Sequence, residues 1–148
     1  GELCLRGPTC TPGYWKNEAA TEETIRDGWL YTGDLVRFDS EGYFFVVGRK
    51  KEMYISGAEN VYPAEIERYL IGHKKIREVA VVGVADEKWG EVGHCFYATE
   101  DGVTLENSDL HSYCLAGLAK YKIPKAFTHL QELPKGASGK IQKRDLIQ

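Results

Sequence analysis

Hydrophobic and polar positions alternate in short runs through the first third of the chain, which predicts β structure interrupted by turns. Leu3 and Leu5 would share one face of the first strand. Two apolar runs, 36–38 and 43–47, flank Asp39–Gly42, whose glycine can adopt a positive φ. The pattern therefore predicts a β-hairpin at this position.

A polar, charged stretch, Gly48–Glu52, interrupts this pattern and is our candidate domain boundary. The apolar residues 53–55 that follow predict a short strand. Pro63 suits the first turn of a helix. Apolar residues then recur at helical spacing up to Gly72, a residue typical of helix C-termini.

The remaining apolar segments predict further strands and one more helix. The β-branched run 79–84 is typical of a buried strand, and 95–99 and 127–130 predict two others. Ser108 is a suitable cap for a helix that ends before Pro124. This irregular alternation predicts an α+β fold, with a roughly three-stranded sheet and helices in the second part of the chain.

Composition narrows the class of protein only slightly. With 148 residues, 43% of them hydrophobic and 28% charged, the chain fits one compact domain or a small domain plus part of another. The net charge of −3 indicates neither a nucleic-acid nor a membrane partner. Segment 120–144 is locally basic, with seven Lys or Arg against one acid, Glu132. Such a segment either covers a solvated surface or binds a small polyanionic ligand.

Four cysteines and four histidines show no metal-site spacing, so we predict no metal site and reduced thiols in a cytoplasmic protein. His111 and Cys114 have ligand-like spacing, but one pair does not make a site. The longest apolar run, 79–85, is too short to span a bilayer, and no signal peptide is recognisable. Gly1 in place of methionine indicates a cut-out or processed chain.

A loop near the C-terminus, Pro134–Ile141, carries a single ammonium group on Lys140 among glycines and small residues. A lysine presented in this way can meet a phosphate or a developing oxyanion as a point charge. The loop is not a Walker motif, because only two residues separate Gly136 from Gly139 and Ile141 stands where Ser or Thr would bind a metal. The alternative is an ordinary solvated lysine.

Three other segments can contact a ligand, and each has a simpler alternative. In Thr32-Gly33-Asp34, a carboxylate beside a glycine can accept hydrogen bonds from both hydroxyls of a ribose, or it can form an Asx-turn. Arg49 can donate to hydroxyls or phosphate, or it can pair with an acid such as Glu52. Ser56-Gly57-Ala58 can admit a thin ligand against bare backbone, or it can be a strand-to-helix turn.

In their order and spacing, the motifs of the chain resemble the adenylate-forming (AMP-binding) superfamily, in particular the acyl-CoA synthetases or fatty-acid–CoA ligases. Each motif alone is weak, but the series covers nearly the whole chain and is highly specific. The motifs are Gly1–Pro8, Pro12–Trp15, Asp27–Leu35, Gly48–Glu67, Lys120–Pro124 and Gly139–Gln142.

The resemblance implies a division into two parts. Residues 1–50 would be the β-rich C-terminal end of a large AMP-binding domain, and residues 51–148 would be a small C-terminal lid domain. The phosphate-binding loop and the acid-binding pocket of such enzymes lie upstream, so this part alone is expected to be inactive. Lys51 matches the hinge at which the lid rotates between two half-reactions.

The resemblance also assigns site residues. Asp34 would bind the ribose hydroxyls of ATP and AMP, with Arg49 and Thr32 beside it. Lys140 would be catalytic, bridging the substrate carboxylate and the α-phosphate. Ser56 and Gly57 would line the channel for CoA, although Ala58 stands where many relatives have a second glycine.

The implied substrates are a carboxylic acid, which we expect to be a fatty acid, together with ATP and CoA. Mg²⁺ would be held mainly by the upstream part, and no nucleic acid or transmembrane segment is expected. An alternative within the superfamily is an adenylation domain that loads a carrier protein, or a luciferase-type enzyme. A more distant alternative is a basic nucleic-acid-binding module, whose affinity would depend strongly on salt.

Overall fold

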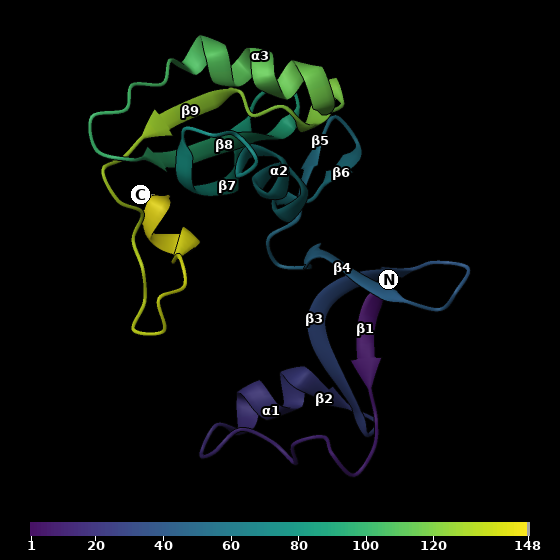
Figure 1. The fold of residues 1–148 in the computed structure, drawn as a ribbon. Helices are drawn as coiled ribbons and strands as arrows, with labels where there is room; N and C mark the ends of the chain where they lie inside the picture. The colour runs from purple at the N-terminus through teal and green to yellow at the C-terminus, as the bar shows by residue number, and fades with distance from the viewer. Residues whose placement is uncertain (148) are drawn as a thin grey trace. The chain divides into compact units, whose positions relative to one another are not determined.

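The structure is a computed structural model that describes residues 1–147. These residues form two compact units, Gly1–Lys51 (unit 1) and the residues from Glu52 onwards (unit 2). Each unit is built on its own β-sheet (Figure 1). No helix among the described residues is long and apolar enough to cross a membrane.

Unit 1 is a four-stranded antiparallel sheet with one short helix. The long strand β3 (Trp29–Phe38) is the central strand. It pairs with β1 (Glu2–Leu5), with β2 (Ile25–Arg26) and with β4 (Phe44–Arg49). Helix α1 (Glu18–Thr24) leads directly into β2.

The hairpin predicted around Asp39 is confirmed, and it joins β3 to β4. Asp39 Oδ1 accepts hydrogen bonds from the backbone N–H groups of Glu41 and Tyr43, each at 3.0 Å, and so fixes the turn. Helix α1 was not predicted. Its N-cap is Asn17, whose Oδ1 accepts a hydrogen bond from Ala20 N–H at 3.1 Å, but the helix buries no residue and therefore has no apolar face to reveal it.

Unit 1 has almost no hydrophobic core of its own. Among residues 1–51, all of which the structure describes, Val36 is the one buried hydrophobic side chain. Aromatic side chains of the β3–β4 hairpin are exposed, with 72% of Phe38 and 66% of Phe44 accessible to solvent. Burial of apolar surface is the main driving force of folding, so unit 1 has little to stabilise it alone.

Unit 2 is built on a five-stranded sheet. The long strands β7 (Ile76–Asp86) and β8 (Gly90–Thr99) form an antiparallel hairpin, and β9 (Ala126–His129) lies parallel to β8. The short strands β5 (Tyr54–Ser56) and β6 (Glu59–Val61) form a second hairpin, in which β5 pairs with β8.

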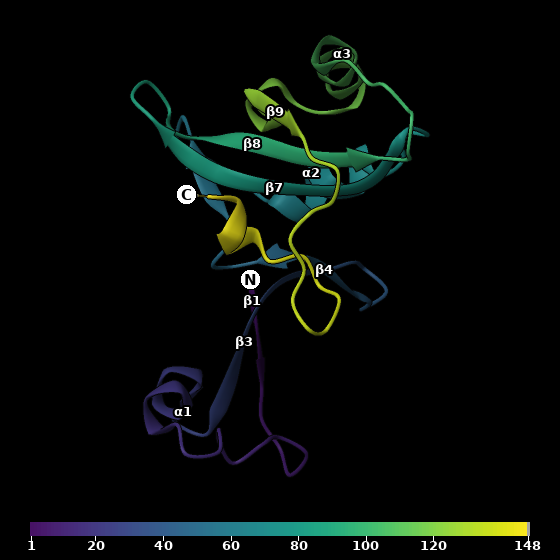
Figure 2. The ribbon, with the colours of Figure 1, turned by 90° about the vertical axis from the view of Figure 1, so that its left-hand side faces the viewer.

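Helices cover one face of this sheet, and the C-terminal segment covers the other (Figure 2). Helices α2 (Pro63–Leu70) and α3 (Asn107–Gly117) contribute to the larger core. Two 3₁₀ turns come after α3 in the chain, η1 (Lys120–Lys122) before β9 and η2 (Lys143–Leu146) after it. The buried residues of this core are Tyr54, Val61, Ile66, Leu70, Ile76, Val79, Val81, Cys95, Tyr97, Leu105, Leu110 and Cys114. The smaller core on the other face consists of Ala80, Ala98 and Leu133.

Two glycines in the β7–β8 hairpin make room for the buried ring of Tyr54. Gly83 and Gly93 face each other across the two strands. A Cβ added to Gly83 would lie 2.5 Å from Tyr54 Cβ, and one added to Gly93 would lie 2.5 Å from its hydroxyl oxygen. Strand β5 is therefore held against the hairpin by an aromatic ring that only bare backbone can accommodate.

The predicted α+β fold class is confirmed, and two details differ. The second sheet has five strands rather than roughly three. The short strand predicted at 53–55 is present as β5, whereas β6 was not predicted, because its three residues are too few to show a period of two. Helix α2 begins at Pro63 as predicted. The predicted Ser108 cap is wrong, because α3 begins at Asn107 and its N-cap, Glu106, makes no side-chain capping bond.

Candidate functional site

In unit 1 the sheet brings Thr32, Asp34 and Arg49 together. Asp34 and Arg49 lie opposite each other on β3 and β4, and Arg49 Nε is 2.9 Å from Asp34 Oδ1. Arg49 Nη1 also donates to the carbonyl oxygen of Thr32 at 3.0 Å. Gly33, between the other two, has a φ of +73°, a conformation that favours glycine. Arg49 therefore pairs with Asp34 and not with Glu52, the acid considered from the sequence.

The Asp34 carboxylate stays partly accessible beside its ion pair. Its Oδ1 lies 2.9 Å from Arg49 Nε. The side chain is 28% exposed, so a ligand can reach it. The neighbouring Thr32 hydroxyl accepts from Asp34 N–H at 3.1 Å and donates to Leu3 O at 2.9 Å, which fixes the backbone that presents the carboxylate. An oriented carboxylate of this kind can accept hydrogen bonds from sugar hydroxyls.

A cavity of about 560 Å³ adjoins this cluster. Thr32 and Arg49 line it, and so does Lys51, whereas Asp34 does not. Its other lining residues are Glu2, Tyr14, Ala20, Glu23, Thr24, Arg26, Tyr31, Gly33 and Lys50. The cavity therefore combines charged groups of both signs with two tyrosine side chains.

The last two residues of unit 1 form exposed ion pairs with glutamates of the same unit. Lys50 Nζ lies 2.8 Å from Glu2 Oε2, and Lys51 Nζ lies 2.8 Å from Glu23 Oε1. The hydrogen bond with Glu23 raises the pKa of Lys51 and lowers that of Glu23. The Lys51 side chain is 86% exposed, so its pair contributes little stability. Lys51 is the last residue before unit 2 begins.

Ser56 and Gly57 lie in the tight hairpin between β5 and β6. Ser56 pairs with Glu59, which leaves Gly57 and Ala58 as a two-residue turn with φ values of +58° and +72°. The sequence-based alternative of a strand-to-helix turn is wrong, because β6 stands between this turn and α2. Ser56 is buried, whereas Gly57 and Ala58 are exposed.

The hairpin turn packs against Trp89, a residue that the sequence did not single out. Gly57 N–H donates to Trp89 O at 2.9 Å. A Cβ added to Gly57 would lie 2.7 Å from the indole Cε3, so the ring covers the bare backbone. Lys88 and Lys125 place their ammonium groups 5.1 and 5.8 Å from the ring centroid. No sequence signal pointed to this group, since Trp89 lies 32 positions after Gly57.

The left-handed conformation of Ala58 leads to a stability prediction. With φ at +72°, its Cβ is crowded by the following carbonyl oxygen. Ala58→Gly should raise the free energy of unfolding by about 1 kcal/mol, measured by urea titration. As a matched control, Ala85→Gly in the exposed, extended part of β7 should lower it by about 0.5–1 kcal/mol. Equal changes in the two variants would contradict the strain at Ala58.

Lys140 lies in the loop closed by hydrogen bonds between residues 134–136 and 140–142. The chain after β9 forms a loop that extends away from the sheet of unit 2 (Figures 1 and 2). Gly136 N–H donates to Lys140 O at 2.9 Å, and Gln142 N–H donates to Pro134 O at 2.8 Å. Gly139, at the tip, has a φ of +76°, and a Cβ added there would meet no atom within 4 Å. The loop thus has a defined base and an open tip.

The basic segment 120–144 is largely neutralised. Five of its seven cationic side chains lie within 4.0 Å of a carboxylate: Lys122, Lys125, Lys135, Lys143 and Arg144. Within residues 1–147, Lys120 and Lys140 have no carboxylate partner. Lys140 is therefore an exposed, unpaired charge on a projecting loop, as a contact with an anionic ligand requires.

The cysteines and histidines form no metal site in the part of the chain that the structure describes, which contains no group of three or more His, Cys, Asp or Glu able to hold a metal ion. All four cysteines are free. Burial raises the pKa of the Cys114 thiol to about 11 and also raises that of Cys95, so neither is an activated nucleophile.

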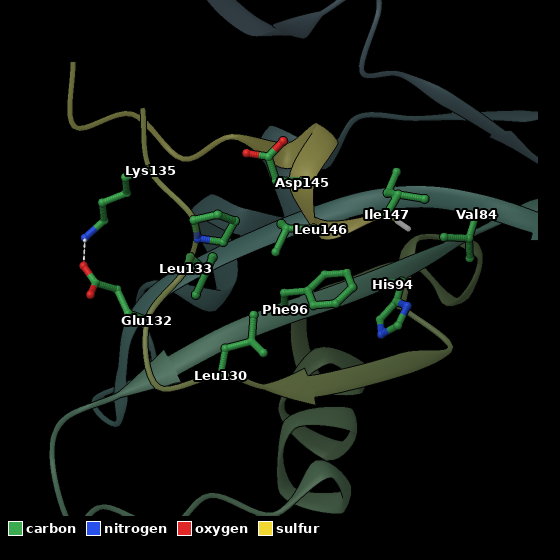
Figure 3. A pocket seen from close by; sticks show the side chains of 11 residues that line it. Val84, His94, Phe96, Leu130, Glu132, Leu133, Lys135, Asp145, Leu146 and Ile147 are labelled. Atoms are coloured by element: carbon green, nitrogen blue, oxygen red, sulfur yellow. Dashed lines mark hydrogen bonds and ion pairs between the residues drawn. The ribbon is translucent and has the colours of Figure 1, made fainter. Parts of the chain in front are cut away.

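A second cavity, in unit 2, lies away from all predicted site residues. Its volume is about 880 Å³, and it lies where the C-terminal segment packs on the sheet of unit 2 (Figure 3). Phe96 and His94 line it from β8, and Leu146 and Ile147 line it from the chain end. None of Thr32, Asp34, Arg49, Lys51, Ser56, Gly57 and Lys140 lines this cavity.

Several proteins that resemble this chain are CoA ligases or CoA synthetases. Residues 65–140, just over half of the chain, match the family described as AMP-binding enzyme C-terminal domain. The chain is 47% identical over 148 residues to a 2-succinylbenzoate–CoA ligase of Bacillus cereus, covering 100% of this chain and 30% of that protein.

Two solved structures show the same fold. One is o-succinylbenzoate CoA synthetase from Bacillus subtilis in complex with its acyl-adenylate intermediate, with a TM-score of 0.92, 40% identity, and coverage of 100% of this chain and 30% of that one. The other is the Mycobacterium tuberculosis fatty acyl CoA synthetase, with a TM-score of 0.69, 39% identity, and coverage of 99% and 29%. The chain thus spans less than a third of the length of these relatives.

Proposed function

Because the chain belongs to the family of AMP-binding enzyme C-terminal domains, we propose that it is the C-terminal part of an AMP-forming acid–CoA ligase. The observation that carries the proposal is the match of all 148 residues to a CoA ligase at 47% identity. In this proposal residues 1–50 end the large AMP-binding domain and residues 51–148 form the lid. The exposed hairpin aromatics and single buried hydrophobic residue of unit 1 support its membership of a larger domain.

The first half-reaction joins the acid to AMP. A carboxylate oxygen attacks the α-phosphorus of ATP, and the bond to pyrophosphate breaks. Both reactants are anions, so a cation between them lowers their repulsion and favours the geometry of attack. Lys140 is suited to this task because its ammonium is exposed and unpaired among the described residues.

Asp34 and Arg49 would hold the nucleotide. The partly exposed Asp34 carboxylate can accept hydrogen bonds from the ribose, while the Arg49 guanidinium at 2.9 Å fixes its orientation. The Thr32 hydroxyl accepts a hydrogen bond from Asp34 N–H and so fixes the backbone next to this carboxylate. The Mg²⁺ that accompanies ATP would be held mainly by the upstream part of the enzyme.

The second half-reaction transfers the acyl group to CoA. Rotation of the lid at Lys51 would withdraw Lys140 and present the Ser56–Gly57 turn to the pantetheine arm. The CoA thiol then attacks the acyl carbon, its proton is lost, and AMP leaves. Gly57 is exposed, but the Trp89 ring fills the space beside its Cα, so the ligand would pass along the outer side of this turn.

The acid itself is a separate part of the proposal. We favour 2-succinylbenzoate, the acid in the name of the relative with 47% identity. The fatty acid expected from the sequence is not supported by that relative, although the fatty acyl CoA synthetase of Mycobacterium tuberculosis is 39% identical to the chain. An ATP–pyrophosphate exchange assay of the full-length enzyme against 2-succinylbenzoate, anthranilate and long-chain fatty acids would decide between them.

A chimera tests the activity with the chain as it stands. Residues 1–148 would replace the matching segment of the Bacillus cereus ligase, and formation of the adenylate and of the CoA thioester would each be measured. We expect both half-reactions with 2-succinylbenzoate. A soluble, folded chimera that forms neither product would overturn the proposal, and adenylate without thioester would favour an acceptor other than CoA, such as a carrier protein, or a luciferase-type fate.

The nucleic-acid-binding alternative is less favoured by the structure. Five of the seven cations of segment 120–144 face carboxylates, which leaves little charge for phosphate contacts. Salt-dependent binding to DNA or RNA would be the observation in its favour.

A further inference from the structure

The arm that follows Lys140 is held to the body of unit 2 by Lys143, and we infer that Lys143 is a positioning residue for Lys140 in adenylate formation. This inference rests on the proposed function. It assigns Lys143 no contact with substrate: the residue would act by holding the loop that presents the catalytic ammonium.

The contacts of Lys143 are those of an anchor. Its ammonium donates to the Glu52 carboxylate, and it lies 2.8 Å from Glu67 Oε1. Only 20% of the Lys143 side chain is exposed, and the same holds for Glu67. A cation between two carboxylates and largely withdrawn from water holds its position better than an exposed pair.

Glu67 is itself fixed to the core. It lies on α2, and its Oε1 accepts a hydrogen bond from Val81 N–H of β7 at 2.7 Å. Through Glu67, Lys143 is therefore connected both to helix α2 and to the β7–β8 hairpin. Glu52 is the second carboxylate in contact with Lys143. It is the first residue of unit 2, next to the proposed hinge at Lys51.

The chain between anchor and loop tip is short. Lys143 follows Lys140 by three residues, a span of about 10 Å at most. The hydrogen bonds at the base of the loop, from Gly136 N–H to Lys140 O and from Gln142 N–H to Pro134 O, couple the two arms. Displacement of Lys143 would therefore be passed on to Lys140.

The leading arm has an anchor of its own. Lys135 Nζ lies 2.6 Å from Glu78 Oε1 and 3.2 Å from Glu132 Oε1, the latter pair drawn in Figure 3. The hydrogen bond from Lys135 lowers the pKa of Glu78. The loop is thus held at both ends by lysine–carboxylate pairs, of which the Lys143 pair is the less exposed.

Apolar packing holds the C-terminal segment in place independently of these charges. Leu133 is buried against Ala80 and Ala98, and Ile141 and Leu146 pack on the same cluster. Loss of the Lys143 charge should therefore loosen the loop without detaching the segment. This separation makes the inference testable.

The test uses the full-length ligase that carries these residues, with both half-reactions measured for wild type and variants. Lys143→Met should lower the rate of adenylate formation about 10- to 100-fold through kcat, with the KM for ATP little changed. Thioester formation from supplied acyl-adenylate should stay within twofold of wild type. Lys143→Arg, which keeps a donor for both carboxylates, should restore most of the lost rate.

Two further variants separate positioning from stability. Arg144→Met removes the neighbouring charge, whose side chain is 82% exposed, and should leave both half-reactions unchanged. Glu67→Gln can keep the hydrogen bond from Val81 N–H while weakening the Lys143 pair, so it should reproduce the adenylation defect with little loss of fold. Urea unfolding of each variant reports its folding directly.

Equal loss of both half-reactions in Lys143→Met, no loss at all, or no recovery in Lys143→Arg would overturn the positioning role. Wild-type enzyme assayed in parallel separates this outcome from failure of the proposed function. If the wild type itself forms no acyl-adenylate, the proposed function fails and the inference falls with it.

Discussion

Lys140→Ala in the full-length ligase is expected to lower the rate of acyl-adenylate formation about 10²- to 10³-fold. The variant removes the exposed ammonium that would lie between the carboxylate of the acid and the α-phosphate of ATP. Thioester formation from a supplied acyl-adenylate should remain largely intact, because Lys140 would be withdrawn at that stage. Pyrophosphate exchange and thioester production, measured separately, check the two statements.

Lys120→Ala is the matched control for this prediction. Lys120 is the other cation of segment 120–144 without a carboxylate partner among residues 1–147, and it is likewise exposed. Its removal should leave both half-reactions near wild type. An equal loss of both half-reactions in Lys140→Ala would show that Lys140 does not act in the first step alone.

Lys51→Pro is expected to have the opposite effect, with adenylate formation retained and thioester formation reduced by at least about tenfold. Proline fixes φ near −65° and also restricts the residue before it, so the backbone at the junction could not rotate freely. Neighbouring backbone is held, since Lys50 N–H donates to Gly33 O at 2.8 Å. Single-turnover measurement of each half-reaction checks the prediction.

The control for the hinge is Lys51→Ala. Alanine removes the ion pair with Glu23 at 2.8 Å but leaves φ free. Because that pair is exposed, its loss should change little, and both half-reactions should proceed. Normal CoA transfer by Lys51→Pro, or a defect shared by Lys51→Ala, would refute a role for backbone rotation at this residue.

Local chemistry made some elements predictable from the sequence. Pro63 fixes its own φ and lacks an N–H, so it begins α2 as predicted. The turn at Asp39 was also predictable, because the Asp39 side chain bonds backbone groups only two and four residues away. The loop of Lys140 was recognised for a similar reason, since its glycines and small residues are adjacent in sequence.

Features that depend on long-range register were not predictable in this way. The pairing of Asp34 with Arg49 depends on an irregularity in the β3–β4 register just after Leu35. Lys143 and Glu52 are separated by 91 positions, and no local pattern relates them. The Gly57–Ala58 turn was misread because β6 is only three residues long. In each case the tertiary fold determines which residues come into contact.

The indole that covers Gly57 also makes unit 2 suited to spectroscopy. Trp89 is the only tryptophan after residue 51, since the other two are Trp15 and Trp29. Trp89 is 42% exposed, and its ring contacts the turn proposed to meet CoA. The tryptophan fluorescence of unit 2 would therefore come from a single residue at that turn, and a quencher or thiol ligand arriving there would change its intensity without any added label.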